Sequence, residues 1–170
     1  IASGLIGHFA SAVSGGSLYR KSSFLLDSIG QQVFAPDIRI RELPHLHKGL
    51  ASSAFDDDGV ATVERNVVEN GIVQGYFLGS YSARKLGMRT TGNAGGTHNL
   101  IMHNATPMDF KAMLKRMHTG LLVTELLGHG VNAVTGDYSR GASGYWVENG
   151  EIAYPVEEIT IAGNLKEIFR

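Results

Sequence analysis

The sequence predicts an α+β protein in which a few short helices accompany a largely antiparallel, barrel-like β-sheet body built of hairpins. Two Asn-Gly pairs, Asn70-Gly71 and Asn149-Gly150, lie between runs rich in aromatic and β-branched residues, which is the strongest short-range signal of a β-hairpin. Segments with helical spacing of apolar residues are few by comparison. Because no repeat or low-complexity linker divides the chain, we expect residues 1–170 to form a single domain.

Length and composition fit one globular domain and exclude several classes of protein. The 170 residues are 43% hydrophobic, which is enough for a substantial core. The net charge of −1 provides no basic face for nucleic acid. The absence of cysteine excludes disulfide bonds and thiolate ligands and suits a cytoplasmic protein. No apolar run approaches the ~20 residues that a membrane helix needs.

One helix is predicted over residues 2–14, because its large apolar residues share one helical face. These residues are Leu5, Ile6, Phe9 and Val13. We expect Gly15-Gly16 to end this helix. A half-exposed strand follows at residues 37–41, where charged and apolar side chains alternate, and Pro44 stops it.

The next segment is predicted to form a turn and a hairpin. The run Asp56-Asp57-Asp58-Gly59 does not match the spacing of an EF-hand calcium loop, so we expect a plain turn there. Strands at residues 60–68 and 72–78 then pair through the turn at Asn70-Gly71. This is the first of the two predicted hairpins.

A short helix, a flexible loop and a short strand are predicted to follow. The helix covers residues 80–86, with Ser80 as its N-cap and Gly87 as its C-terminal stop. The loop is the glycine-rich segment 92–99, and the strand covers residues 100–103. The loop therefore lies between two ordered elements.

The clearest helix signal starts at Thr106, a credible N-cap that is followed by Pro107 at the first helical position. Asp109 would lie in the electropositive first turn. We predict a buried stripe of large apolar residues on this helix, which Gly120 ends. The stripe consists of Phe110, Met113, Leu114 and Met117.

The last third of the chain is predicted to be mostly strand. After a strand at residues 121–127 and a connecting segment at residues 131–135, the segment 136–144 is predicted to be an open glycine loop. The second hairpin then turns at Asn149-Gly150, and Pro155 marks a sheet edge or a break before residues 156–161. The hairpin contains Trp146, whose large ring we expect to seal one face of the core.

Five motifs, in order along nearly the whole chain, resemble the PmbA/TldD family. They are LYRKSSFLLDSIGQ at 18–31, HKGLASSAFDDDGV at 47–60, SYSARKLGM at 80–88, TGNAGGTHN at 91–99 and GDYSRGASGYWVENGEIAYPVEEITIAGNL at 136–165. The last motif is similar to the C-terminal region of the PmbA (TldE) branch. The resemblance implies the C-terminal domain of a longer PmbA-like chain. A start at Ile1 without methionine and an end at Arg170 lead us to expect that both ends are truncated.

The resemblance also implies an activity and a partner. TldD-like members carry the zinc of a cytoplasmic metallopeptidase that matures or degrades peptides, and PmbA-like members are their partners. The TldD-like zinc motif, His-Glu-x-x-x-His, corresponds to a stretch of this sequence with Ser3, Gly4 and His8. Serine is a poor zinc ligand and glycine cannot activate water, so we expect no cofactor in this chain and zinc in a TldD-like partner.

Candidates for peptide contact lie in the two glycine-rich segments, 92–99 and 136–144. They are His98, Asn99, Asp137, Tyr138 and Arg140. Glycine admits close approach of a second main chain, and the fork of Arg140 matches a carboxylate. We predict that both segments lie on one side of the sheet and line a shared cleft. The alternatives are a structural loop around His98 and a surface ion pair for Arg140.

Three hypotheses for function remain from the sequence. The first is a non-catalytic PmbA-like subunit that forms a heterodimer with a TldD-like zinc subunit and provides the wall of the substrate cleft. The second is a metallopeptidase in its own right with unconventional ligands such as His8 and His98. The third is a binding protein that modulates DNA gyrase, as an older family name suggests. We expect peptides or unfolded proteins as substrates, leave self-association open, and expect neither nucleic acid nor membrane as a partner.

Overall fold

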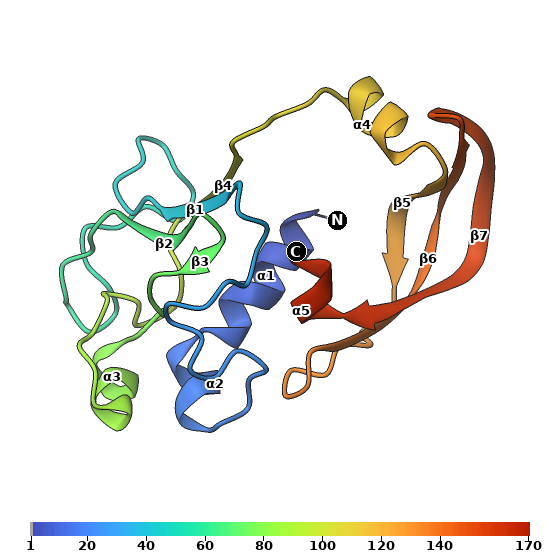
Figure 1. Ribbon diagram of the computed structural model, residues 1–170. Coiled ribbons are helices and arrows are strands. Elements are labelled where there is room, and N and C mark those ends of the chain that lie inside the picture. The colour runs from blue at the N-terminus through green and yellow to red at the C-terminus, as the bar shows by residue number, and fades with distance from the viewer. Residues whose placement is uncertain (1) are drawn as a thin grey trace.

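The computed structural model describes residues 2–170 and places the strands in two antiparallel sheets (Figure 1). A four-stranded sheet has the order β3-β2-β1-β4, and a three-stranded sheet has the order β5-β6-β7. The strands are β1 (Ile38–Glu42), β2 (Arg65–Glu69), β3 (Ile72–Val73), β4 (Leu100–Asn104), β5 (Gly120–Leu127), β6 (Asp137–Glu148) and β7 (Glu151–Asn164). The predicted α+β class is confirmed. Over the described residues both sheets stay open, so two separate sheets replace the barrel-like body.

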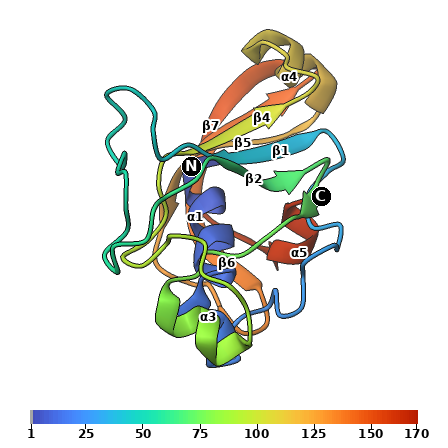
Figure 2. The ribbon, with the colours of Figure 1, turned by 90° about the vertical axis from the view of Figure 1, so that its left-hand side faces the viewer.

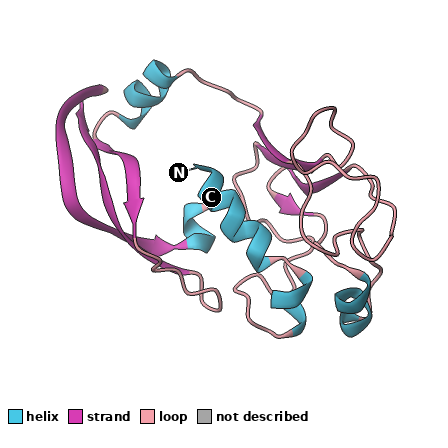
Figure 3. Cartoon of the chain, turned by 180° about the vertical axis from the view of Figure 1, so that it is seen from behind, coloured by secondary structure: helices cyan, strands magenta, loops and turns pink. Residues whose placement is uncertain are grey.

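The helices of the described chain are short and connect or cover the sheets. They are α1 (Ala2–Ala12), α2 (Gly15–Tyr19), α3 (Ser80–Leu86), α4 (Phe110–Met117) and α5 (Leu165–Ile168). α1 and α5 lie between the two sheets, as opposite views show (Figures 1 and 3). α4 and α3 lie at opposite ends of the molecule (Figure 2). None of the helices within residues 2–170 has the length and apolar character to cross a membrane.

The main hydrophobic core forms where α1 packs against the four-stranded sheet. Phe9 and Val13 of α1 have no exposed surface, in agreement with the predicted apolar face. Phe9 meets Phe34 edge-on with ring centroids 5.0 Å apart, and Phe34 stacks on Phe169 at 4.7 Å. Phe169 therefore closes the core immediately after α5.

The predicted end of the first helix at Gly15-Gly16 is wrong in detail, because Gly15 begins α2. The side-chain oxygen of Ser14 caps α2 by accepting a hydrogen bond from the backbone nitrogen of Ser17 at 3.4 Å. A side chain at Gly15 would collide with Ser82 of α3. Glycine is therefore needed at this position for the close packing of α2 on α3.

Three predicted features of the helix ends can be compared with the observed caps. Gly87 ends α3 in the left-handed conformation (φ 66°), as predicted, but Gly79 rather than Ser80 occupies the N-cap position. Asp109, and not Thr106, caps α4, because its carboxylate accepts a hydrogen bond from the backbone three residues further on at 2.7 Å. The predicted cap was thus three residues too early.

The apolar stripe of α4 is only partly buried, contrary to the prediction. Leu114 is 7% exposed, whereas Phe110 and Met113 are 53% and 41% exposed. α4 connects β4 to β5 at one end of the three-stranded sheet, away from the main core (Figure 1). The periodicity correctly predicts a helix there, but the described chain covers little of its apolar face.

The first predicted hairpin is confirmed, with shorter strands than expected. β2 and β3 pair through Asn70 (φ 52°) and Gly71 (φ 75°), the pair of left-handed residues that a type I′ turn requires. Residues 60–64 and 74–78 lie outside these strands. β1 and β4 agree with the predicted strands to within one residue at each end.

The predicted open loop at residues 136–144 is wrong, because most of it belongs to β6. β6 pairs with β5 on one side and with β7 on the other. A side chain at Gly144 would collide with the carbonyl oxygen of Leu122 on β5. Glycine thus serves close strand approach here rather than a turn. The connecting segment 131–135 contributes a single bridge, between Val131 and Tyr138.

The second predicted hairpin is confirmed at Asn149 (φ 53°) and Gly150 (φ 78°). Pro155 lies inside the continuous strand β7, opposite Tyr145. Since β7 is the edge of its sheet, the proline marks an edge and not a break. Trp146 is only half-buried, and its Nε1 donates to Glu148 at 3.1 Å, so the expectation that it seals the core is wrong.

Candidate functional site

α1 carries the three residues that the family resemblance aligns with the TldD-like zinc motif. Ser3 and Gly4 are exposed, and His8 is half-buried. A side chain added at Gly4 or Gly7 would have no atom of another described segment within 4 Å. Within the described residues, the helix therefore presents an open surface around Gly4 and Gly7.

Three of the candidate residues come together where α1 faces β6. The rings of His8 and Tyr138 meet edge-on with centroids 6.0 Å apart, and Tyr138 is 5% exposed. Burial lowers the pKa of His8, and the positive charge of Arg140 lowers it further. No local pattern in these residues predicts that the helix and this strand meet.

An apolar cavity of about 310 Å³ lies beside this contact, between α1, α5 and the three-stranded sheet. It is lined by Leu5, Val123, Leu126, Tyr138, Ile161, Ala162 and Ile168. A second cavity of about 60 Å³ lies further along α1, where His8 and Ser11 contribute to its wall. The larger cavity is therefore apolar, and Arg140 lies near it because its cross-strand partner Ile161 lines the cavity.

The residues of this region do not fit a zinc ion. Zinc in a hydrolytic site takes three protein ligands from His, Asp, Glu or Cys. Residues 2–170 contain no group of three such side chains close enough to share an ion. At the motif itself, Ser3 and Gly4 cannot replace a histidine ligand and a glutamate base, which leaves His8 alone.

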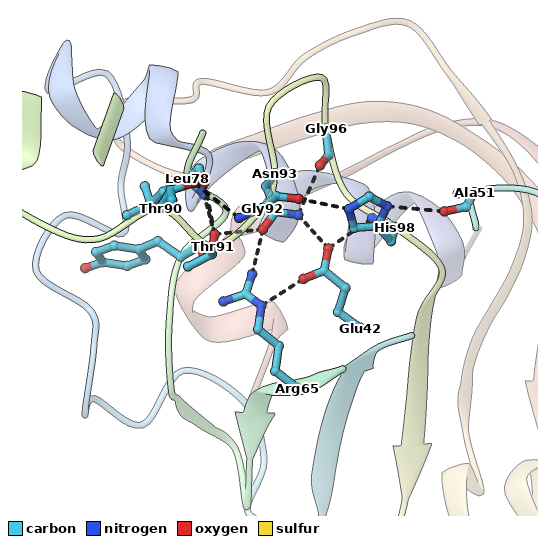
Figure 4. Close-up of polar contacts among 11 residues, drawn as sticks. Glu42, Ala51, Arg65, Leu78, Thr90, Thr91, Gly92, Asn93, Gly96 and His98 are labelled. Atoms are coloured by element: carbon cyan, nitrogen blue, oxygen red, sulfur yellow. Dashed lines mark hydrogen bonds and ion pairs between the residues drawn. The ribbon is translucent and has the colours of Figure 1, made fainter. Parts of the chain in front are cut away.

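A second polar cluster surrounds the buried carboxylate of Glu42, the last residue of β1 (Figure 4). Glu42 is 1% exposed. Arg65 Nε donates to Glu42 Oε2 at 2.8 Å, and Oε1 accepts from Asn93 Nδ2 at 2.6 Å and from the backbone nitrogen of His98 at 3.0 Å. Glu42 thus joins β1, β2 and the glycine-rich segment 92–99.

Asn93 extends this cluster into the glycine-rich segment itself. Its Oδ1 accepts from Arg65 Nη2 at 3.1 Å and from Thr91 Oγ1 at 2.7 Å, and its Nδ2 also donates to the carbonyl of Gly96 at 3.0 Å. Every polar atom of the Asn93 side chain therefore has a partner. The segment is a fixed structure and not the flexible loop that its glycines suggested.

The side chains of His98 and Asn99 also contact backbone groups of the protein itself. The two ring nitrogens of His98 face the carbonyl oxygens of Gly92 (3.0 Å) and Ala51 (3.3 Å). Asn99 Nδ2 donates to the carbonyl of Leu43 at 2.9 Å, and its Oδ1 accepts from the backbone nitrogen of Ala51 at 3.0 Å. These contacts match the structural alternative for His98. A contact with peptide stays a prediction for both residues.

Asp56 anchors the turn next to this segment. Burial by itself would raise the pKa of Asp56, but the backbone N–H groups of Ala94, Val60 and Asp58 and the nearby His98 ring outweigh it. The three N–H donors lie 2.9 Å from the carboxylate oxygens. The pKa of Asp56 is therefore below its ordinary value, and the residues 56–59 form the predicted turn.

The lowered pKa of Asp56 predicts a loss of stability in acid. A carboxylate with a lower pKa in the folded state stabilises the fold above the ordinary value of 3.8, and this contribution disappears as the pH falls through the folded pKa. We expect the difference in unfolding free energy between wild type and Asp56→Asn to be constant above about pH 5 and to shrink below about pH 4. Urea unfolding at each pH measures it, with Asp57→Asn as the control. A difference that stays constant down to pH 2 would contradict the assignment.

Asp137 has a structural role at the start of β6. Its carboxylate accepts from Thr135 Oγ1 at 2.6 Å and from Asn164 Nδ2 at 3.0 Å. These two hydrogen bonds lower the pKa of Asp137 against a smaller opposing effect of burial. The contacts tie the turn before β6 to the end of β7.

The predicted peptide-contact residues fall into two groups on different sheets. His98 and Asn99 lie beside the four-stranded sheet, whereas Asp137, Tyr138 and Arg140 lie on β6 of the three-stranded sheet. Within residues 2–170 no hydrogen bond or ring contact joins the two groups. The prediction that both segments lie beside one sheet is wrong. A cleft that both segments share stays a prediction.

The described chain thus consists of two open antiparallel sheets with α1 and α5 between them. The sequence profile of the PmbA/TldA metallopeptidase C-terminal domain matches residues 1–170. The chain belongs to the PmbA/TldD family of metallopeptidases, and the resemblance in its motifs is confirmed.

Individual relatives agree with this assignment. The metalloprotease PmbA of Escherichia coli O157:H7 is 58% identical over all 170 residues, which span 38% of that protein. The crystal structure of a modulator of DNA gyrase from Bacteroides thetaiotaomicron matches with a TM-score of 0.91 and 32% identity, over 98% of this chain and 38% of that one. TldE from Thermococcus kodakarensis matches with a TM-score of 0.81 and 26% identity, over 96% of this chain and 40% of that one. The chain thus spans less than half the length of these relatives.

Proposed function

We propose that this chain is the C-terminal domain of a PmbA (TldE)-like subunit of a cytoplasmic zinc metallopeptidase, and that a TldD-like partner supplies the zinc and the general base. The supporting observation is that Ser3 and Gly4 are exposed on α1, where the family resemblance aligns them with the histidine and the glutamate of the zinc motif. Neither residue can then serve as the general base that the glutamate provides in TldD-like members. The reaction is hydrolysis of unfolded or modified peptides, including peptide maturation.

The geometry around α1 suits a supporting subunit. The space above Gly4 and Gly7 is free of other atoms, so a second polypeptide can approach the helix closely. Next to this space, Tyr138 and Arg140 of β6 face α1 beside an apolar cavity of about 310 Å³. This chain would bind and orient the peptide there, while chemistry takes place on the partner.

A metallopeptidase in its own right would have to use His8 and His98, and their contacts argue against it. Both ring nitrogens of His98 already face carbonyl oxygens, and the ring of His8 is held against Tyr138. His98 lies beside the four-stranded sheet, whereas His8 faces β6. Binding of a metal ion to these two histidines would break the contacts of His98 with the carbonyl oxygens and the contact of His8 with Tyr138.

A pull-down and a zinc measurement on the full-length protein test the proposal. We expect the tagged full-length chain to recover a TldD-like protein from its own cytoplasm and to carry far less than one zinc when purified alone. The recovered complex should contain zinc and cleave an unfolded peptide. Stoichiometric zinc in the isolated chain that His8→Ala removes would support the second hypothesis instead. Recovery of gyrase without a TldD-like protein would support the third.

A further inference from the structure

Arg140 stands on the inward face of β6, where its neighbours are apolar. On the same face lie Tyr138 and Ala142, which are 5% and 1% exposed. The cross-strand partner of Arg140 on β7 is Ile161, a residue that lines the apolar cavity together with Tyr138. The guanidinium group of Arg140 thus lies at the edge of the apolar cavity.

The guanidinium of Arg140 has no protein partner in the described chain. Among residues 2–170 no hydrogen bond or ion pair involves its side chain, and its Nε is buried without an acceptor. By contrast, Arg39, Arg41 and Arg65 each pair with a carboxylate. A buried donor without an acceptor is destabilising. An arginine kept in this state indicates an acceptor that comes from outside the described residues.

The facing helix offers no carboxylate of its own. Its exposed face carries Ser3, two glycines with open space around them, and His8. His8 is the titratable group that α1 places near Arg140, and a histidine side chain is neutral or positive, so it cannot neutralise the guanidinium. Arg140 therefore forms a site for an anion, with no anionic side chain of α1 beside it.

The shape of the site limits what the anion can be attached to. The cavity of about 310 Å³ next to Arg140 is almost entirely apolar in its lining. Arginine binds a carboxylate bidentately through its planar fork, which gives orientation as well as affinity. A ligand that fits both features has a carboxylate next to an apolar side chain.

We propose that Arg140 is a carboxylate-binding residue for the peptide substrate, and that the apolar cavity beside it takes the side chain adjacent to that carboxylate. The carboxylate comes either from the C-terminus of the peptide or from an aspartate or glutamate within it. This proposal rests on the proposed function for the identity of the ligand as a peptide.

Binding of matched peptides to the full-length complex tests the site. The complex is freed of zinc with a chelator so that peptides are bound but not cleaved. One fluorescein-labelled peptide ends in leucine as the free acid or as the amide, and a second, amidated peptide carries Leu-Glu or Leu-Gln in its interior. We expect the charged member of at least one pair to bind about tenfold more tightly, since a charge-assisted hydrogen bond has this effect. Anisotropy titrations measure it, and the pair that responds identifies the source of the carboxylate.

Variants at Arg140 test whether the preference for the charged peptide depends on this residue. Arg140→Gln should abolish the preference, Arg140→Lys should keep part of it, and Arg89→Gln, an exposed arginine elsewhere, should leave it unchanged. Circular dichroism and complex formation check that each variant folds; if Arg140→Gln does not fold, the partial loss in Arg140→Lys is the deciding result. Equal binding of acid and neutral peptides by the wild type, or a preference that survives Arg140→Gln, would overturn the proposal.

The outcomes separate this proposal from the proposed function. An acid preference in the isolated full-length chain, with no TldD-like protein recovered, would keep the carboxylate site and remove the subunit role. A complex that assembles and cleaves peptides without any preference for the acid would keep the subunit role and remove the carboxylate site. If Arg140→Gln prevents assembly with the partner while leaving the fold intact, the carboxylate belongs to the partner subunit and the peptide proposal is wrong.

Discussion

Glu42→Ala should destabilise the protein by about 3–5 kcal/mol, because it leaves a largely buried cation without its partner. Arg65 keeps only 19% of its side chain exposed and would lose its single carboxylate. Asn93 and the backbone nitrogen of His98 would also lose the acceptor Oε1. The change therefore removes the partner of three groups in one buried network.

A matched control lies next to this pair in the sequence. Arg41 and Glu64, the neighbours of Glu42 and Arg65, form an ion pair at 3.6 Å with side chains that are 41% and 49% exposed. Exposed pairs of this kind contribute roughly 0–1 kcal/mol. Glu64→Gln should therefore cost less than about 1 kcal/mol. The comparison separates the effect of burial from that of losing a charge on these strands.

Urea unfolding of the full-length protein measures both variants, and hydrogen exchange reports where the effect is felt. In Glu42→Ala the amide of His98 should exchange faster, since its acceptor is removed, while amides of β6 should be unchanged. A loss below about 1 kcal/mol, equal to that of Glu64→Gln, would show that the network around Glu42 contributes little. Faster exchange throughout β6 would contradict the local origin of the effect.

The sequence predicts those elements whose signal is local. Two Asn-Gly turns, the alternation in β1 and the glycine that ends α3 all appear where their residues require them. The inward position of Glu42 could also have been found, because it shares the alternate positions of β1 with Ile38 and Ile40. A carboxylate on the same strand face as two isoleucines indicates either a buried ion pair or a functional residue.

The failures concern glycines and long-range contacts. The glycines of β6 read as a loop, yet Gly144 is needed because the carbonyl of Leu122 on β5 leaves no room for a side chain. A glycine that permits a turn and one that permits close strand approach look the same in a sequence. Likewise, the meeting of His8 with Tyr138 depends on how α1 crosses the sheet, and no local pattern contains that information.

Phe9→Ala should be as damaging as the loss of Glu42, at about 3–5 kcal/mol, and should exceed the effect of Trp146→Ala. Phe9 has no exposed surface and packs edge-on against Phe34, with Phe169 6.5 Å away between ring centroids. Its removal leaves a cavity at the centre of the core, between α1, the four-stranded sheet and the C-terminal residues. These three parts come from distant segments of the chain and cannot easily close around the gap.

Trp146 gives the contrasting case, although it is the larger residue and the only tryptophan of the chain. It is half-buried on the three-stranded sheet, pairs with Leu121 and Tyr154 across the strands, and donates to an exposed Glu148. Solvent and neighbouring side chains can fill the space that its ring leaves, so we expect a loss of about 1–2 kcal/mol. Urea unfolding of the two variants shows whether burial or residue size determines the loss in unfolding free energy. If Trp146→Ala costs as much as Phe9→Ala, the ring must be covered in the full-length protein by residues outside 2–170, and the three-stranded sheet is then an interface and not a free surface.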